Sequence, residues 1–191
     1  MPATNDNTIM TPRITILSGT NRTGSVTRAL AGHVASLYAD GGAQPTLLDL
    51  ATLGPEWFTP DAYTRRGDTT RSEARAVLEC DGLLVLTPEY NGSIPGVLKL
   101  FLDLLPFPAA LAGRPSAFIG LAAGNWGGLR AVEQLQAIFA YRNAHLFPGR
   151  VFISGTDANL ANGQPAPDYA TRINRQTTDF IGYVRRFATK A

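Results

Sequence analysis

The chain has 191 residues, enough for one domain with a sizeable core, and its hydrophobic content of 45% and charged content of 17% are globular values. A net charge of +2 without blocks of like charge argues against a nucleic-acid partner. No apolar run is long enough to cross a bilayer, and no signal peptide is indicated, so no membrane partner is expected. The single cysteine, Cys80, excludes an internal disulfide and favours a reducing compartment, so we expect a cytoplasmic protein.

Strand and helix patterns alternate along the chain, after a polar segment (residues 1–12) that we expect to be a disordered tail. Apolar runs predict five strands, at residues 13–18, 44–50, 81–87, 115–122 and 150–154. Helical spacing predicts five helices, at residues 26–39, 69–80, 95–105, 129–142 and from an N-cap at Asp168 to about Lys190. No repeat or linker divides residues 13–191, so they are expected to form a single domain.

Strands that alternate with helices argue for a parallel sheet with helices on both faces, an α/β three-layer sandwich. Five strands and five helices fit the flavodoxin-like strand order 2-1-3-4-5. Right-handed crossovers then bring the loops after strands one, three and four to one edge of the sheet, where ligands bind in this architecture. These are the glycine-containing loops at residues 19–25, 88–94 and 123–128.

The first loop has the residues of a phosphate site. It precedes a helix amino terminus, whose unpaired N–H groups and partial positive charge attract an anion. Hydroxyls and a guanidinium surround this terminus, and the residues expected to hold the phosphate are Thr20, Arg22, Ser25, Val26 and Thr27. The alternative is a glycine turn in which Ser25 only caps the helix.

Two other phosphate motifs are excluded by residue type. Ser25 stands where a Walker A loop needs its lysine, which disfavours hydrolysis of a nucleoside triphosphate. Gly19 is the one glycine in the first turn, where a Rossmann dinucleotide loop needs more, and Asp49 after the second strand does not compensate. A monophosphate such as FMN fits the loop that remains.

Residues 88–99 read Pro-Glu-Tyr-Asn-Gly-Ser-Ile-Pro-Gly-Val-Leu-Lys. This stretch resembles the Pro-x-Tyr-Asn-x-Ser-x-Pro-Gly-x-Leu-Lys signature of the NADPH-dependent FMN reductase family, the flavodoxin-like quinone, chromate and azo-compound reductases. The first loop is similar to the family's Gly-Ser-x-Arg-x-x-Ser, with Thr20 in place of the first serine, and residues 124–135 are similar to its third flavin loop. Leu100 and Leu104 depart from the Asn and Trp that the family often has there.

The resemblance implies an oxidoreductase in which bound FMN passes electrons from NADPH or NADH to a small acceptor: a flavin, a quinone, an azo compound or a metal oxyanion. It implies that the flavin ring lies against Pro88, Glu89, Tyr90 and Asn91, with Gly124, Asn125 and Gly127 at its pyrimidine end. The flavin supplies the chemistry, so no side chain is assigned as catalytic, and no cluster has metal-ligand spacing. A non-enzymatic electron carrier or flavin-binding module is the alternative, although the basic pI of about 8.9 is unlike the usual acidic flavodoxin.

Three further expectations concern surfaces. The helix at 95–105 is apolar nearly all round, so one face should pack on the sheet and the other on a second copy, giving a homodimer or a tetramer. Residues 51–68, with Trp57 among their aromatics, form either a lid or a loop anchored to the core. Glu89 is expected to be solvated rather than to act in acid–base chemistry.

Overall fold

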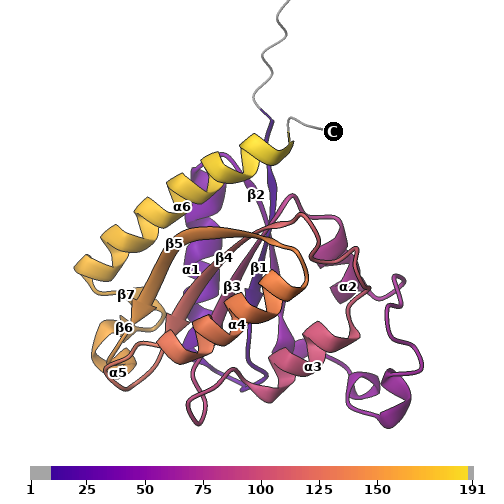
Figure 1. Ribbon diagram of the computed structural model, residues 1–191. Coiled ribbons are helices and arrows are strands. Elements are labelled where there is room, and N and C mark those ends of the chain that lie inside the picture. Colours follow the sequence, from indigo (N-terminus) through magenta and orange to yellow (C-terminus); the bar gives the residue numbers. More distant parts are fainter. Residues whose placement is uncertain (1–9, 189–191) are drawn as a thin grey trace, which may run out of the picture.

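The computed structural model describes residues 10–188, and its centre is a five-stranded sheet of order β2-β1-β3-β4-β5 (Figure 1). All the pairings between these strands are parallel, which confirms the predicted flavodoxin-like topology. The strands are β1 (Arg13–Ser18), β2 (Gln44–Asp49), β3 (Gly82–Pro88), β4 (Pro115–Leu121) and β5 (His145–Ile153). Two of the three interior strands, β3 and β4, are buried along their whole length, as expected for strands covered on two faces.

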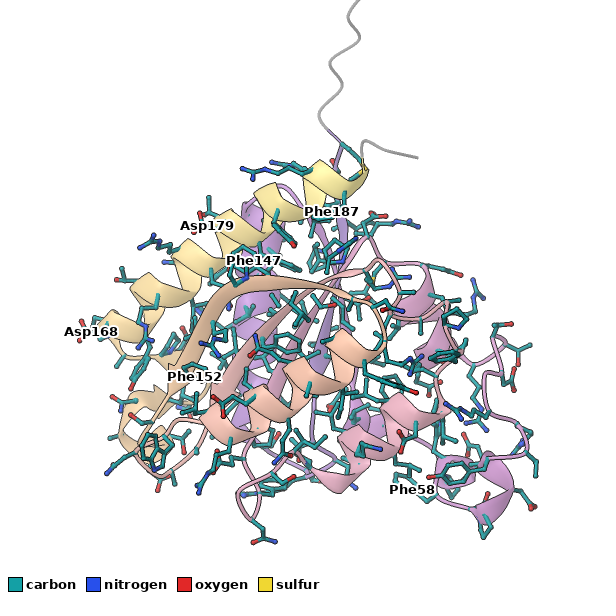
Figure 2. All side chains as sticks on the ribbon, viewed as in Figure 1. Phe58, Phe147, Phe152, Asp168, Asp179 and Phe187 are labelled. Carbon is teal, nitrogen blue, oxygen red and sulfur yellow. The ribbon has the colours of Figure 1, made fainter. Side chains whose placement is uncertain are left out.

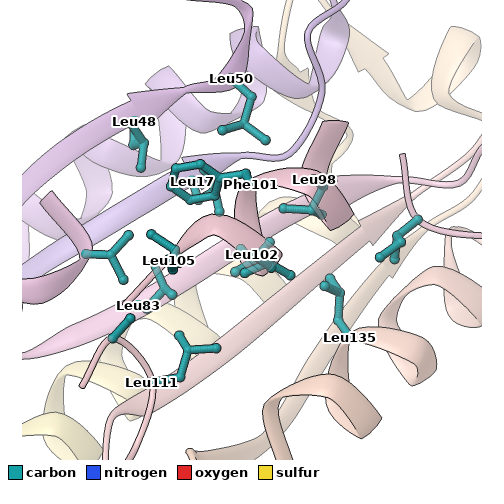
Figure 3. Close-up of a cluster of buried hydrophobic side chains, with 14 of the residues drawn as sticks. Leu17, Leu48, Leu50, Leu83, Leu98, Phe101, Leu102, Leu105, Leu111 and Leu135 are labelled. Atoms are coloured by element: carbon teal, nitrogen blue, oxygen red, sulfur yellow. The ribbon is translucent and has the colours of Figure 1, made fainter. Parts of the chain in front are cut away.

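Helices cover both faces of this sheet and complete the three layers. One face carries α1 (Val26–Asp40) and α6 (Pro167–Ala188), and the other carries α2 (Ser72–Leu78), α3 (Gly96–Leu104) and α4 (Leu129–Tyr141) (Figure 1). The buried side chains therefore form two clusters, one for each face. Alternation along a strand divides its residues between them: Ile16 of β1 belongs to the α1–α6 cluster and Leu17 to the other cluster, shown in Figure 3.

The predicted starts of the fifth strand and of the last helix are wrong. The strand β5 begins at His145 rather than at residue 150, because Pro148 and Gly149 interrupt its apolar run and several of its side chains are exposed. Helix α6 begins at Pro167, a favoured first helical residue, so Asp168 lies in the first turn rather than at the N-cap (Figure 2). Lys190, the expected end of this helix, lies outside the described residues.

The loop expected between β5 and α6 contains regular structure. A short helix, α5 (Thr156–Asn159), is followed by a two-stranded antiparallel hairpin of β6 (Leu160–Ala161) and β7 (Gln164–Pro165). The predicted helix at residues 69–80 is shorter than expected, since α2 begins at Ser72.

The connection from β2 to α2 is anchored to the core by a tryptophan. It contains three short 3₁₀ helices, η1 (Leu50–Thr52), η2 (Pro55–Trp57) and η3 (Pro60–Ala62). The Trp57 side chain is only 1% exposed, and its ring lies 5.4 Å from the ring of Phe101 on α3. Phe58, in contrast, is exposed at the periphery (Figure 2). The chain itself therefore covers much of the second apolar face of α3, which the sequence had assigned to a second copy.

The expected tail falls mainly on residues 1–9, which lie outside the described residues. At Pro12 the chain is already attached to the sheet, because the Pro12 carbonyl accepts a hydrogen bond from the Gln44 N–H at 2.8 Å. Within residues 10–188, no helix combines the length and the apolar character needed to cross a membrane.

Candidate functional site

A cavity of about 230 Å³ lies at the carboxyl edge of the sheet, where the topology brings the loops after β1, β3, β4 and β5 together. Residues of all four loops line it. Seven of them are predicted site residues: Arg22, Ser25, Val26, Thr27, Pro88, Glu89 and Tyr90. The other five are Leu121, Ala122, Ala123, Thr156 and Asp157.

The first loop brings the amino terminus of α1 to this cavity. Gly19 is required where the loop leaves β1, because a Cβ there would lie 2.8 Å from the carbonyl oxygen of Leu86. Ser25 caps α1: its Oγ accepts a hydrogen bond from the Arg28 N–H at 3.2 Å. A capping hydroxyl retains its own O–H as a donor, so the capping role and the phosphate role of Ser25 are compatible. The N–H groups of Val26 and Thr27 belong to the first turn, which has no intrahelical acceptors.

Thr20 lies behind the cavity rather than in its wall. Its side chain is fully buried, and its hydroxyl is 2.9 Å from the hydroxyl of Tyr90 on the second loop. The same Thr20 oxygen accepts a hydrogen bond from the Arg22 N–H at 3.2 Å. Thr20 therefore connects the first loop to the second and fixes the position of the Tyr90 ring at the cavity.

The second loop is a tight hairpin turn. Tyr90 and Ser93 exchange backbone hydrogen bonds of 2.9 and 3.0 Å, and both intervening residues have positive φ, 51° at Asn91 and 74° at Gly92. Asn-Gly with two positive φ angles is the pattern of a type I′ turn. Asn91 is thus exposed at the tip of the turn and does not line the cavity. Its contact with the flavin stays a prediction.

Glu89 is buried, so the expectation of a solvated carboxylate is wrong. Its side chain is only 5% exposed, and Oε1 accepts a hydrogen bond from Nε of Arg130 at 2.8 Å and forms an ion pair with Nη2 of the same residue. The other oxygen, Oε2, is buried without a hydrogen-bond partner in the part of the chain that the structure describes. Sequence alone did not place Arg130, at the start of α4, against this loop.

The third loop lies flat against the ends of β4 and β5. Gly127 and Gly128 have φ angles of 58° and 84°, and a Cβ on Gly128 would lie 2.5 Å from the backbone nitrogen of Leu121. Only glycine permits this approach together with this conformation. Gly124 and Asn125 are exposed, Gly127 is buried, and none of the three lines the cavity. Their contacts with the flavin therefore stay predictions.

The loop after β5 contributes residues that the sequence analysis missed. Thr156 is 7% exposed, and its N–H donates to the Ala122 carbonyl at 3.3 Å, so α5 is fixed to the end of β4. Asp157 follows it into the cavity lining. The topology contained the information needed, because a fifth parallel strand must end at the same edge as the other four.

Comparison with known proteins agrees with this geometry. The sequence model of the NADPH-dependent FMN reductase family matches residues 12–159. The chain belongs to this family. Membership confirms the enzymatic reading, an NAD(P)H-dependent oxidoreductase that uses FMN, over the alternative of a non-enzymatic electron carrier.

Individual relatives, and one solved structure, show how far the similarity extends. A 2-hydroxy-1,4-benzoquinone reductase from Burkholderia sp is 33% identical over 135 residues, which cover 69% of this chain and 72% of the relative. An NADPH azoreductase from Bacillus sp. (strain OY1-2) is 27% identical over 172 residues, or 90% and 92% of the two chains. Among solved structures, the flavoenzyme NAD(P)H:(acceptor) oxidoreductase FerB from Paracoccus denitrificans superposes with a TM-score of 0.75 at 20% identity, covering 92% and 98%, and supports the fold.

The residues at the cavity fit the FMN of this family. One end has the α1 terminus with Arg22, which suits a dianionic phosphate. Next to it lie apolar wall residues, Leu121 and Ala122, which suit a ring, and Glu89 with an unpartnered buried oxygen, which suits a ligand donor.

Proposed function

We propose that this FMN reductase binds the phosphate of FMN at the amino terminus of α1 and reduces small quinone-like or azo acceptors. The observation that carries the proposal is the cavity between the α1 terminus and residues 88–90, which joins an anion site to a partly apolar wall. The names of the quinone and azo reductases among its relatives support this choice of acceptor class.

Each residue at the cavity has a part in binding or orientation. Arg22, the Ser25 hydroxyl and the N–H groups of Val26 and Thr27 hold the phosphate. Pro88, Glu89 and Tyr90 form a rigid wall beside the ring, since Thr20 fixes the hydroxyl of Tyr90. Bound flavin supplies the redox chemistry by accepting a hydride from NADPH or NADH and passing electrons on.

The remaining predicted contacts belong to the same proposal. Asn91 lies at the tip of the turn, and Gly124, Asn125 and Gly127 lie in the third loop, all beside the cavity rather than in its lining. They would contact a flavin that extends beyond the enclosed part of the site.

The test is a comparison of activities and ligands with the purified protein. Without oxygen and with FMN no more than equimolar to the protein, we expect sustained NADPH or NADH oxidation only when a quinone or azo dye is also present. Double-reciprocal plots should give parallel lines, because both substrates use one site in turn. Absence of NAD(P)H oxidation with every acceptor would contradict the proposed activity. Intersecting lines would contradict the shared site.

We also propose a homodimer that contacts through α3 and α4. A hollow of about 600 Å³ lies between these helices, and Phe107 and Tyr141 at its rim are 59% and 79% exposed. Large exposed aromatics beside a groove that also contains Leu102 and Ile138 are typical of an interaction surface. Light scattering should give the mass of two chains, and Tyr141→Glu should reduce it to one. A single-chain mass for the unaltered protein at micromolar concentration would contradict the dimer.

We also propose that residues 13–191 form a single domain. A cytoplasmic location completes the proposal. The described chain is built around one five-stranded sheet, with one buried cluster on each of its faces. One cysteine and the use of NAD(P)H suit a reducing compartment.

A further inference from the structure

Glu89 presents a buried carboxylate oxygen that none of the described residues satisfies. Its side chain is 5% exposed and lines the cavity at the carboxyl edge of the sheet. Oε1 is occupied by the guanidinium of Arg130, whereas Oε2 has no hydrogen-bond partner among residues 10–188. Leaving a buried charged acceptor unsatisfied is unfavourable by more than leaving a neutral one, so this atom requires a donor from outside the protein.

The orientation of the Glu89 carboxylate is fixed from two sides. The Glu89 N–H donates to the Leu121 carbonyl at 3.1 Å, which attaches its backbone to the end of β4. Arg130 holds Oε1 from α4, and one turn later Gln134 accepts a hydrogen bond from the Ser93 hydroxyl at 2.6 Å. Since α4 holds Ser93 at one end of the hairpin and one carboxylate oxygen of Glu89, the other oxygen is the one left for a ligand.

The donor that a carboxylate selects can be named from flavin chemistry. A carboxylate only accepts hydrogen bonds. The polar edge of the oxidised isoalloxazine carries carbonyl oxygens and unprotonated nitrogens, which are acceptors, and a single N–H at ring position N3. The ribityl hydroxyls can both donate and accept, so the hydroxyls of Ser25, Thr27 and Thr156 in the same cavity serve them equally well.

We propose that Oε2 of Glu89 accepts a hydrogen bond from the N3–H of the flavin ring, and that Arg130 is the positioning residue that directs this oxygen. Arg130 does not line the cavity and is 56% exposed, so it acts through Glu89. The inference rests on the proposed function, in that the cavity is taken to hold FMN.

The test compares FMN with FMN methylated at N3, each titrated into flavin-free protein and followed by flavin fluorescence. In Glu89→Gln, Arg130 retains the amide oxygen, because it can only donate, and the NH₂ group then faces the ring donor. We expect Glu89→Gln to weaken FMN binding by about tenfold or more, the range for hydrogen bonds to charged groups. The methylated flavin has no N3–H. The ratio of its dissociation constants for Glu89→Gln and for the unaltered protein should therefore equal the ratio measured for a control variant and the unaltered protein.

The control variant is Glu133→Gln, whose flavin binding is compared with that of the unaltered protein. Glu133 is exposed on α4 three residues from Arg130 and does not line the cavity, so its substitution removes the same charge without touching the site. Arg130→Met tests the positioning role. If Arg130 acts through Glu89, the double variant should bind FMN no more weakly than Glu89→Gln alone.

Three results would overturn the inference: FMN binding unchanged in Glu89→Gln, a loss that persists with the methylated flavin, or losses that add in the double variant. If the unfolding midpoint measured without flavin shows that Glu89→Gln does not fold, the test uses the unaltered protein alone. The unaltered protein must then bind FMN more tightly than it binds the methylated flavin. Failure of the unaltered protein to bind FMN at all would instead refute the proposed function.

Discussion

Removal of the Arg22 guanidinium should weaken FMN binding and leave riboflavin binding unchanged. Arg22 lines the cavity beside the amino terminus of α1, and its own N–H is fixed to the Thr20 hydroxyl at 3.2 Å, so the backbone of the loop is ordered around it. A hydrogen bond to a charged group contributes about 1.5–3 kcal/mol. The Arg22 side chain is exposed, which places the effect of Arg22→Ala near the lower value, about tenfold in the dissociation constant.

The assay is a titration of flavin-free protein with FMN and with riboflavin, at low and high salt. Arg28→Ala is the matched control. This substitution also removes one positive charge, in this case from the first two turns of α1. Arg28, however, pairs with Asp49 at 3.2 Å and does not line the cavity. Equal weakening of riboflavin, or an equal effect of Arg28→Ala on FMN, would refute the assignment of a direct phosphate contact. A general electrostatic effect should also disappear at high salt, whereas a direct contact should persist in part.

Two further predictions concern stability. Trp57→Ala should lower the free energy of unfolding by about 3–5 kcal/mol, since it empties a fully buried site against Phe101; a loss below about 1 kcal/mol in a denaturant titration would show that residues 51–68 do not anchor α3. Burial of Asp81 opposes its ionisation, but hydrogen bonds from the Arg13 side chain and backbone outweigh this and hold the pKa of Asp81 below its usual value. The stabilisation is therefore complete above the unfolded pKa of about 3.9 and is lost as the pH falls through the folded pKa. Asp81→Asn should cost up to about 1 kcal/mol at neutral pH, and a difference that persists at pH 2 would contradict this account.

The fold was predictable because its determinants are local and periodic. Continuous apolar runs such as residues 82–86 are typical of strands buried on two faces, and the alternation with helices leaves few topologies. Prediction was poorest at β5, since an edge strand needs no apolar residue on its exposed positions. It also assigned the second face of α3 to a partner, because Trp57 is 44 residues away in sequence from the Phe101 ring on which it packs.

Glu89 shows why the site was only partly predictable. Whether a carboxylate is solvated or buried depends on its surroundings, and its partner Arg130 is 41 residues further along the chain. That pairing exists because the glycines at 127 and 128 let the third loop lie flat on β4, which brings the first turn of α4 against the hairpin after β3. The sequence contains both Glu89 and Arg130, but their contact depends on the backbone φ angles at Gly127 and Gly128. Motifs therefore located the loops of the site, whereas the charges that face one another across it required the fold.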